Sequence, residues 1–462
     1  MDSTVYATHA RYYNNTVAAI EKAHSTPGDL CFIFVQHAFL PSLTFFSSID
    51  RQVAAVVPKG SSAKSNPEVV QQLKARYGDR VYSDITRSRL ADVEYTVKWL
   101  QQVALGRPFA ILEYGGYFAP AAAAISNDPV LGRQLVGFVE GTENGIKGSD
   151  DGKTPGYRDV AHRLRHPVIS KSRSRIKSIM DLEIGSAIVY ATDGIFRRNL
   201  GCSLKYWRGR VGVIGLGIIG KGVLRTLAKD NCQPYVFDTN LSIMAELAIR
   251  QNHIVSQKQV LRQSDLLFLN TGSCFLSKAP ELLAEIRDGA VIVLCTSGDV
   301  EAGIPQLVAS GHLTLSVTDS TDEIAVFTTR YQKKVRVLLA RDGVGQAPNM
   351  SMEDGSSSPA NLMSDMEFYA LGKYLASSRC KLKPGDIHVT PDELENLILR
   401  EWLREFYPAC GVSDVAHAGF QDASCSVADL EAVADLEGEF SIRQDQSFEA
   451  LPAYESPDRE FC

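Results

Sequence analysis

The stretch 207–227 of this 462-residue chain reads WRGRVGVIGLGIIGKGVLRTL. Its β-branched run VGVIG predicts a strand, and the periodic apolar residues that follow predict a helix. Gly215, Gly217 and Gly220 form the pattern GxGxxG at the junction. The first glycine of such a turn permits a tight bend, the second lets the backbone approach a pyrophosphate, and the third lets the helix pack closely on the strand. Because a helix N-terminus also offers unpaired N–H groups and a positive dipole end, the stretch predicts a dinucleotide-binding turn.

The residues around this turn indicate which ligand it binds. Ile218 and Ile219 separate the last two glycines, and we expect both to contact the cofactor. Lys221 is followed by glycine rather than by Ser or Thr, which excludes a Walker phosphate loop. Asp238 ends the run PYVFD, 18 residues after Gly220, where a carboxylate accepts both adenosine ribose hydroxyls. Since the same carboxylate would repel a 2′-phosphate, the sequence predicts NAD rather than NADP.

Strand-like and helix-like segments alternate on both sides of the turn. Before it come the apolar runs LCFIFVQ, VAAVVP, FAILEYGG and QLVGFVEG, with helical patterns between them; after it come PYVFD, DLLFLN, AVIVLC and LTLSVT. This alternation predicts an α/β protein with two doubly wound, Rossmann-like parallel-sheet domains joined by helical connectors. We expect a substrate-binding domain over 1–194, an NAD-binding domain over 195–350, a return helix and helical segment over 351–420, and a poorly ordered acidic tail over 421–462.

Composition excludes several classes of protein. The net charge is −6, but residues 421–462 contain eleven acidic and two basic residues, so the rest of the chain carries about +3 and gives no electrostatic case for nucleic acid. The nine cysteines are scattered without a CxxC pair, so we expect neither a disulfide framework nor a metal site. No apolar run approaches the roughly 18 residues of a membrane span, and no signal pattern opens the chain, so we expect a cytoplasmic protein without a membrane partner.

Seven further stretches share an order with one known family. They are QHAFLPSLTFFSSI (36–49), EYGGYF (113–118), FVEGTENG (138–145), KSRSRIKS (171–178), NTGS (270–273), RYQKKVRVLLARDG (330–343) and PNM (348–350). Over about residues 28–405 the chain resembles the S-adenosylhomocysteine hydrolases, which have a substrate domain first, an NAD domain later and a return helix. The resemblance implies the same order of domains here.

The resemblance also implies a reaction and a set of site residues. In that family, NAD stays bound and oxidises the ribose 3′-hydroxyl, which acidifies the neighbouring C–H and permits elimination and water addition before the hydride returns. His37 matches the active-site histidine, and Lys171 matches the lysine that takes the hydroxyl proton. Glu140 falls in a loop that contacts the sugar. The positions that match NAD contacts are Thr142, Asn144, Asn270, Thr271, Gly272 and Asn349.

The departures from the family pattern cluster in the substrate pocket. Tyr117 replaces an aspartate of the turn, and Met180 replaces a cysteine near the nicotinamide. The family's Gly-His-Phe-Asp becomes SGDV, which contains Asp299, and Ser358 replaces a second histidine. We therefore expect an NAD-dependent enzyme that oxidises a secondary hydroxyl of a nucleoside or sugar, with the ketone serving elimination, epimerisation or redox. Tyr117 would join His37 and Lys171 in catalysis, and Asp299 and Ser358 would bind substrate with Glu140.

Three alternatives stay open at this point. The first alternative is a genuine adenosylhomocysteinase in which Tyr117 and serines substitute for the missing groups. The second is a catalytically silent NAD-binding protein that regulates a partner. A D-2-hydroxyacid dehydrogenase shares the central GLGxIG signature, but that family needs an arginine after the fifth strand, where this chain has CTSGDV. The resemblance also implies a homo-oligomer, a dimer or tetramer.

Overall fold

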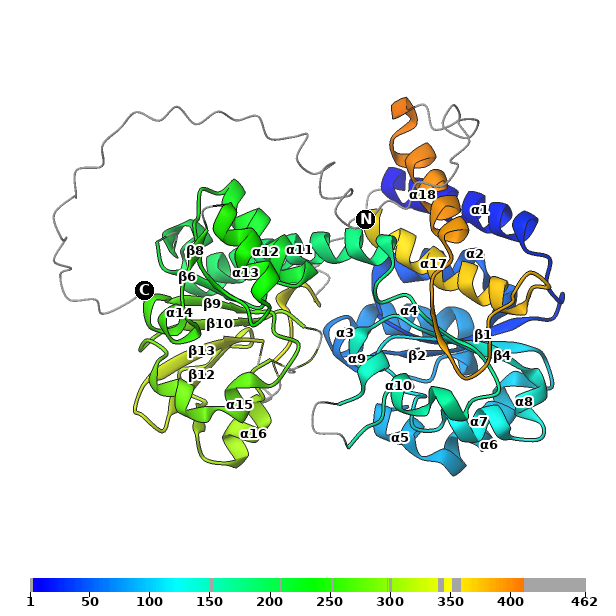
Figure 1. The fold of residues 1–462 in the computed structure, drawn as a ribbon, viewed down its shortest axis with the longest axis horizontal. Coiled ribbons are helices and arrows are strands. Elements are labelled where there is room, and N and C mark those ends of the chain that lie inside the picture. The colour runs from blue at the N-terminus through cyan, green and yellow to red at the C-terminus, as the bar shows by residue number, and fades with distance from the viewer. Residues whose placement is uncertain are drawn as a thin grey trace.

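A computed structural model describes residues 3–149, 153–207, 209–250, 252–296, 298, 301–339, 345–350 and 359–410. These residues form two α/β units that lie side by side (Figure 1). The first unit contains a six-stranded sheet in the order β14-β5-β4-β3-β1-β2, and every neighbouring pair in it is parallel. Its strands are β1 (Cys31–Gln36), β2 (Val53–Pro58), β3 (Phe109–Glu113), β4 (Leu135–Glu140), β5 (Val168–Ser170) and β14 (Ile387–Val389).

Helices cover both faces of this first sheet, which is why strands such as CFIFVQ are continuous apolar runs rather than alternating ones. One hydrophobic cluster lies under α1 (Ser3–Ala23), α2 (Leu40–Ser48), α4 (Pro67–Tyr77), α17 (Pro359–Ala376) and α18 (Asp392–Phe406). The cluster on the opposite face lies under α5 (Arg87–Ala91), α6 (Val93–Ala104), α7 (Ala122–Asn127), α8 (Leu131–Gln134) and α10 (Tyr157–Val160). Short helices α3 (Gly60–Ser65) and α9 (Glu143–Lys147) follow strands β2 and β4.

The second unit contains an eight-stranded sheet in the order β11-β12-β13-β10-β9-β6-β7-β8. Its strands are β6 (Val211–Ile214), β7 (Tyr235–Phe237), β8 (His253–Ile254), β9 (Leu266–Leu269), β10 (Val291–Leu294), β11 (Leu313–Ser316), β12 (Ile324–Thr329) and β13 (Lys334–Leu338). The six neighbouring strands β13, β10, β9, β6, β7 and β8 are parallel, which confirms the predicted doubly wound α/β fold. The other edge is antiparallel, because residues 330–333 join β12 to β13 and are too few for a parallel crossover.

The faces of the second sheet are covered in the same way. Helices α12 (Ile218–Lys229) and α13 (Leu241–Ile249) lie with α11 (Arg175–Leu200) on one face, and α14 (Gln257–Gln263), α15 (Phe275–Lys278) and α16 (Ile304–Ala309) lie on the other. None of the helices in the described parts of the chain is both long and apolar enough to cross a bilayer.

Helix α11 joins the two units and spans the predicted boundary between residues 194 and 195. It crosses α12 at very short range, since a Cβ on Gly185 would lie 2.4 Å from the Ile219 carbonyl oxygen, and one on Gly222 would lie 2.3 Å from that of Leu182. Only glycine fits at both positions, so the two helices pack backbone to backbone. This contact fixes the first turn of α12 relative to the first sheet.

The chain then returns to the first unit through α17, which packs against β3 and β4. Strand β14 follows and pairs with β5, although the sequence predicted only helix in this segment. Its three residues, Ile387–Val389, are too few to show an alternation of apolar and polar positions, and the neighbouring strand supplies the pairing. The predicted acidic tail, 421–462, lies outside the described residues.

Candidate functional site

The carboxyl ends of the parallel strands in both sheets open onto one cleft. The first sheet reverses its strand order between β1 and β3, and the second between β6 and β9. Ligands of doubly wound folds bind at such switch points, outside the carboxyl ends of the strands. Here a cleft of about 1190 Å³ takes its lining from both units, including His37, Tyr117, Gly217 and Asn270. The topology therefore brings the predicted cofactor turn together with His37 and Tyr117, two of the predicted catalytic residues.

The Gly-rich turn has the backbone geometry that its sequence predicts. Gly215 has φ +88°, and a Cβ there would lie 2.5 Å from the Asn270 carbonyl oxygen. A Cβ on Gly220 would lie 2.1 Å from the Gly215 carbonyl oxygen, so the helix could not pack on the strand with any larger residue. At Gly217 a Cβ would meet nothing within 4 Å. Gly217, Ile218, Ile219 and Gly220 line the cleft, and Gly217 leaves open the space that a pyrophosphate needs.

Asp238 lies at the end of β7, beside this turn. Its Oδ2 accepts a hydrogen bond from the Leu216 N–H at 2.6 Å, and its Oδ1 accepts one from the Asn240 N–H at 2.7 Å. The carboxylate thus stands next to the glycines, as a ribose-binding acid must, although Asp238 is not among the described residues that line the cleft. Its role toward NAD stays a prediction.

Two asparagines of the cleft have buried amide atoms without hydrogen-bond partners in the described part of the chain. They are Oδ1 and Nδ2 of Asn270, after β9, and Oδ1 of Asn349, in the short segment before α17. A buried polar atom without a partner is costly, so such atoms mark where a ligand would complete the structure. Gly272 lines the cleft with them, whereas the Thr271 hydroxyl donates to the Ser273 carbonyl oxygen within its own turn.

Two predicted cofactor contacts come from the first unit. Thr142 begins α9 as its N-cap, and its Oγ1 accepts a hydrogen bond from the Gly145 N–H at 3.0 Å. Asn144 follows in the first turn of that helix. Both residues line the cleft on the side opposite the Gly-rich turn, which places them where a cofactor held on α12 would meet the first unit.

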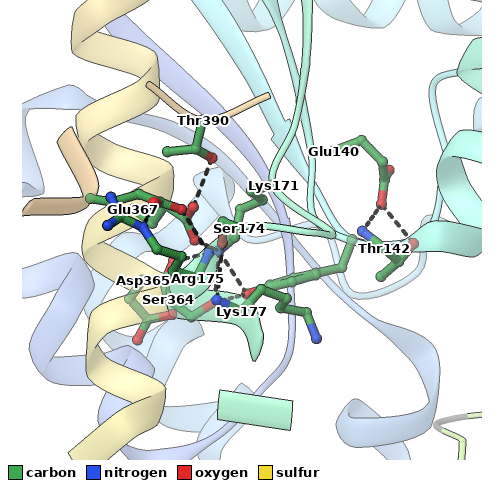
Figure 2. A network of polar contacts seen from close by, with 12 residues as sticks. Glu140, Thr142, Lys171, Ser174, Arg175, Lys177, Ser364, Asp365, Glu367 and Thr390 are labelled. Atoms are coloured by element: carbon green, nitrogen blue, oxygen red, sulfur yellow. Dashed lines mark hydrogen bonds and ion pairs between the residues drawn. The ribbon is translucent and has the colours of Figure 1, made fainter. Parts of the chain in front are cut away.

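Lys171 follows β5 and is fully buried against α17 (Figure 2). Its Nζ donates to Oγ of Ser364 at 2.6 Å and to the Ser364 carbonyl oxygen at 2.7 Å, and it lies 3.4 Å from Oε2 of Glu367. Burial lowers the pKa of Lys171 to about 8, against the opposing effect of the Glu367 carboxylate. Ser364 and Tyr114 line the cleft, but Lys171 is not among the described lining residues. The Ser364 hydroxyl thus lies between the Lys171 amine and the cleft.

A second lysine of the same stretch faces the cleft directly. Lys177, in the first turn of α11, forms an ion pair with Asp181, and both residues line the cleft. Sequence reasoning did not single out this pair. The signal was present as a lysine and an aspartate at i and i+4, which share one face of a helix.

His37 follows β1 and also lines the cleft, as predicted. Its ring stacks on Phe39 with centroids 5.3 Å apart, and its Nε2 lies 3.5 Å from Nζ of Lys59. Burial, followed by the positive charges of Lys59 and Lys177, keeps the pKa of His37 well below its ordinary value. The imidazole is therefore neutral at physiological pH, and its buried Nδ1 has no partner among the described residues.

Glu140 ends β4 and holds the neighbouring loops together. Its carboxylate accepts hydrogen bonds from the backbone N–H groups of Gly115 (2.9 Å) and Gly116 (2.7 Å). It also accepts from both the N–H and the hydroxyl of Thr142, each at 2.7 Å (Figure 2). Glu140 is fully buried and is not among the described lining residues of the cleft. Its observed contacts are those of a loop anchor, and its predicted substrate contact stays a prediction.

Tyr117 is held by a second buried glutamate that the sequence analysis did not identify. Glu113, the register partner of Glu140 in β3 and β4, accepts hydrogen bonds from the Tyr117 N–H at 2.6 Å and from the Tyr157 hydroxyl at 2.5 Å. Burial and the nearby Glu140 raise the pKa of Glu113. The Tyr117 ring itself lines the cleft, with the guanidinium of Arg87 5.9 Å from its centroid.

Asp365, on α17, is a further cleft residue that sequence reasoning missed. It accepts hydrogen bonds from the Tyr13 hydroxyl at 2.7 Å and from Nε2 of Gln36 at 3.0 Å. Burial raises its pKa to about 6. The signal was a pair of acidic residues, Asp365 and Glu367, inside the mostly apolar helical run NLMSDMEFYALG. The predicted substrate residues Asp299 and Ser358 lie outside the described residues. Within the described ranges, no cluster of three His, Cys, Asp or Glu side chains is placed to hold a metal.

No family model matches the sequence, and no curated protein matches it either. Among solved structures, the chain is similar to apo D-lactate dehydrogenase from Escherichia coli, at 14% identity and a TM-score of 0.30 over 57% of this chain and 73% of that one. It is similar to phosphoglycerate oxidoreductase from Vibrio cholerae O395, at 12% identity and a TM-score of 0.30 over 50% and 72%. A formate dehydrogenase from Granulicella gives 16% identity and a TM-score of 0.29 over 48% and 66%. Similarity at this level says nothing about the activity of this chain.

Proposed function

We propose that the protein is an NAD-dependent oxidoreductase that oxidises a secondary hydroxyl of a small polar substrate, a nucleoside or sugar, in a site arranged like that of the adenosylhomocysteine hydrolases. One observation carries the proposal: the Gly-rich turn of α12 and the strand ends of the first sheet line the same cleft. A dinucleotide held on the turn would present its reactive ring to side chains of the first unit.

The residues present fit NAD. Gly217 leaves open space over the N-terminus of α12, and both amide atoms of Asn270 and Oδ1 of Asn349 are buried at the cleft without partners in the described chain. The nicotinamide carboxamide offers both a donor and an acceptor, which matches asparagine amides. Gly217, Ile218 and Ile219 would hold the pyrophosphate, Asp238 the adenosine ribose, and Asn270 and Asn349 the carboxamide. When bound, NAD supplies a hydride acceptor.

The side chains of the first unit must then take the proton of the substrate hydroxyl, since a hydride leaves carbon readily only as that proton departs. Ser364 lies at the cleft wall, and Lys171 lies 2.6 Å behind its hydroxyl. With the Lys171 amine neutral, Ser364 accepts the substrate proton and passes its own proton to Nζ. The pKa of about 8 makes this neutral form accessible near physiological pH, which an ordinary lysine would not be.

His37 and Tyr117 are placed to orient the substrate or to move a second proton. With Lys59 protonated beside Nε2, the favoured tautomer of His37 carries its proton on Nδ1, because two donors would otherwise face each other. His37 then acts as a neutral hydrogen-bond donor at the cleft. The Tyr117 side chain lies across a fixed turn from it, anchored by Glu113.

The test starts with NAD binding to the full chain by calorimetry, followed by a screen of nucleosides and sugars for the near-ultraviolet absorbance of reduced nicotinamide. Tight NAD binding and reduction by at least one compound support the proposal. Failure to bind NAD removes it. Release of a free thiol from adenosylhomocysteine would instead identify the hydrolase of the family that the sequence resembles, and NAD binding without any turnover would favour a regulatory protein.

A further inference from the structure

The carboxyl edge of the first sheet carries a cluster of cations to which the proposed function assigns no group of the substrate. Lys59 follows β2, the edge strand next to β1, and its N–H donates to the Gln36 carbonyl oxygen at 2.8 Å. Arg87 begins α5, on the opposite side of the sheet from α17. Both residues line the cleft, together with His37, Ser61 and Tyr117. Two basic side chains from separate elements thus act on one corner of the cleft: Lys59 lies beside His37, and Arg87 lies over Tyr117 and repels Lys59.

We infer that this corner is an anion subsite, in which Lys59 and Arg87 bind a carboxylate or phosphate group of the substrate beside His37. The inference rests on the proposed function and names its substrate class: a hydroxylated small molecule that also carries an anionic group. Arginine and lysine side chains that share a partly desolvated site are the usual partners of such groups.

The first support is a set of unpartnered buried atoms. Nε of Arg87, Oγ of Ser61 and Nδ1 of His37 are each buried without a hydrogen-bond partner among the described residues. Nε and the hydroxyl can both donate, and with the tautomer derived above Nδ1 donates as well. Donors that lack acceptors at one corner of a cleft are matched by a ligand that consists of acceptors, and a carboxylate or phosphate is such a ligand.

The second support is the charge around the corner. Nζ of Lys59 lies 3.5 Å from the His37 ring, and Lys177 acts on both groups. The two carboxylates that act on Lys59 already have hydrogen-bond donors: Glu140 accepts four hydrogen bonds from the loops, and Glu113 accepts from the Tyr117 N–H and the Tyr157 hydroxyl. Burial lowers the pKa of Lys59 to about 8 against the opposing charge of Glu140, and the repulsion of Arg87 and Lys177 adds to the lowering. An added negative charge would relieve this repulsion.

The test is calorimetric titration of the full chain with inorganic phosphate and with acetate, at constant ionic strength, in the presence and absence of NAD. We expect the wild-type protein to bind at least one of the two anions. Arg87→Gln should weaken that binding roughly tenfold or more, since hydrogen bonds to charged groups are among the strongest. Lys59→Gln should weaken anion binding by a similar factor, and it tests the inference if the arginine variant fails to fold.

Arg89→Gln is the matched control, because Arg89 lies on the same short helix but stacks over Tyr95 at 4.1 Å and is exposed. It should leave anion binding unchanged. The inference is overturned if no anion binds. It is also overturned if wild type, Arg87→Gln and Lys59→Gln bind the anion equally, which is the result expected when phosphate is held only on the Gly-rich turn. The NAD titration of the same samples reports separately on the proposed function, so the two failures are distinguishable.

Discussion

The buried pair of Lys171 and Glu367 gives the sharpest prediction about stability. Both side chains are fully inaccessible to solvent, 3.4 Å apart, and Oε1 of Glu367 also accepts the Thr390 hydroxyl at 2.8 Å. Lys171→Met keeps an unbranched side chain only one atom shorter but leaves the Glu367 charge buried without its cation. Breaking a buried pair in this way costs about 3–5 kcal/mol, so we expect a loss of that size in the free energy of unfolding of the first unit, measured by urea denaturation.

A double-variant cycle and a matched control separate this effect from lost packing. Adding Glu367→Gln to Lys171→Met should recover at least about 1 kcal/mol relative to the sum of the two single changes, because the stranded charge is gone. Lys373→Met, on the same helix α17 as Glu367, should cost much less, because its partner Glu21 is half exposed at 3.8 Å. A loss below about 1 kcal/mol for Lys171→Met, or strict additivity in the cycle, would contradict the reasoning.

Three more predictions concern the cofactor and pH. Gly217→Ala should change the unfolding free energy by no more than about 0.5 kcal/mol, because a Cβ there meets nothing within 4 Å, but it should weaken NAD binding at least about tenfold. Gly220→Ala should instead destabilise the fold by roughly 1–3 kcal/mol, because its Cβ would lie 2.1 Å from the Gly215 carbonyl oxygen. Calorimetry and urea unfolding of both variants check this. Asp238→Asn should reduce the preference for NAD over NADP, measured as the ratio of their dissociation constants. The folded pKa of Lys171 lies below its unfolded value of 10.5, so the free energy of unfolding should rise as the pH rises from about 8 to 10.5. The rate of substrate oxidation should rise through about pH 8, as the Lys171 amine loses its proton. Lys171→Met should flatten both pH profiles.

The central turn and the sheets around it were predictable because their signals are local. The GxGxxG pattern joins one strand to one helix, and each glycine has a reason within that unit: the tight bend at Gly215, the open space at Gly217 and the close packing at Gly220. Apolar runs such as CFIFVQ likewise predict strands that helices cover on both faces. Strand β14 gave no such signal, because three residues at a sheet edge owe their pairing to β5 rather than to their own pattern.

The site was predictable in part, because its residues come from the ends of distant strands. Matching stretches to a family placed His37 and Asn349 at the cleft, where the structure also has them. It could not reveal that the Lys171 side chain turns toward α17 or that Glu140 accepts hydrogen bonds from the Gly115 and Gly116 N–H groups, since both depend on contacts between segments far apart in the chain. Asp365 was missed for the same reason: the role of an acid in a mostly apolar helix can be recognised only when Tyr13 and Gln36 are seen to donate to it.

The central claim is that a dinucleotide lies on the N-terminus of α12 and points its reactive ring at the strand ends of the first sheet. A crystal structure of the full chain grown with NAD tests this most directly. The account predicts the pyrophosphate over Gly217 and the carboxamide within hydrogen-bond distance of Asn270 or Asn349, with the ring facing Ser364. NAD density elsewhere on the protein, or a cleft without NAD in crystals grown at saturating cofactor, would contradict it.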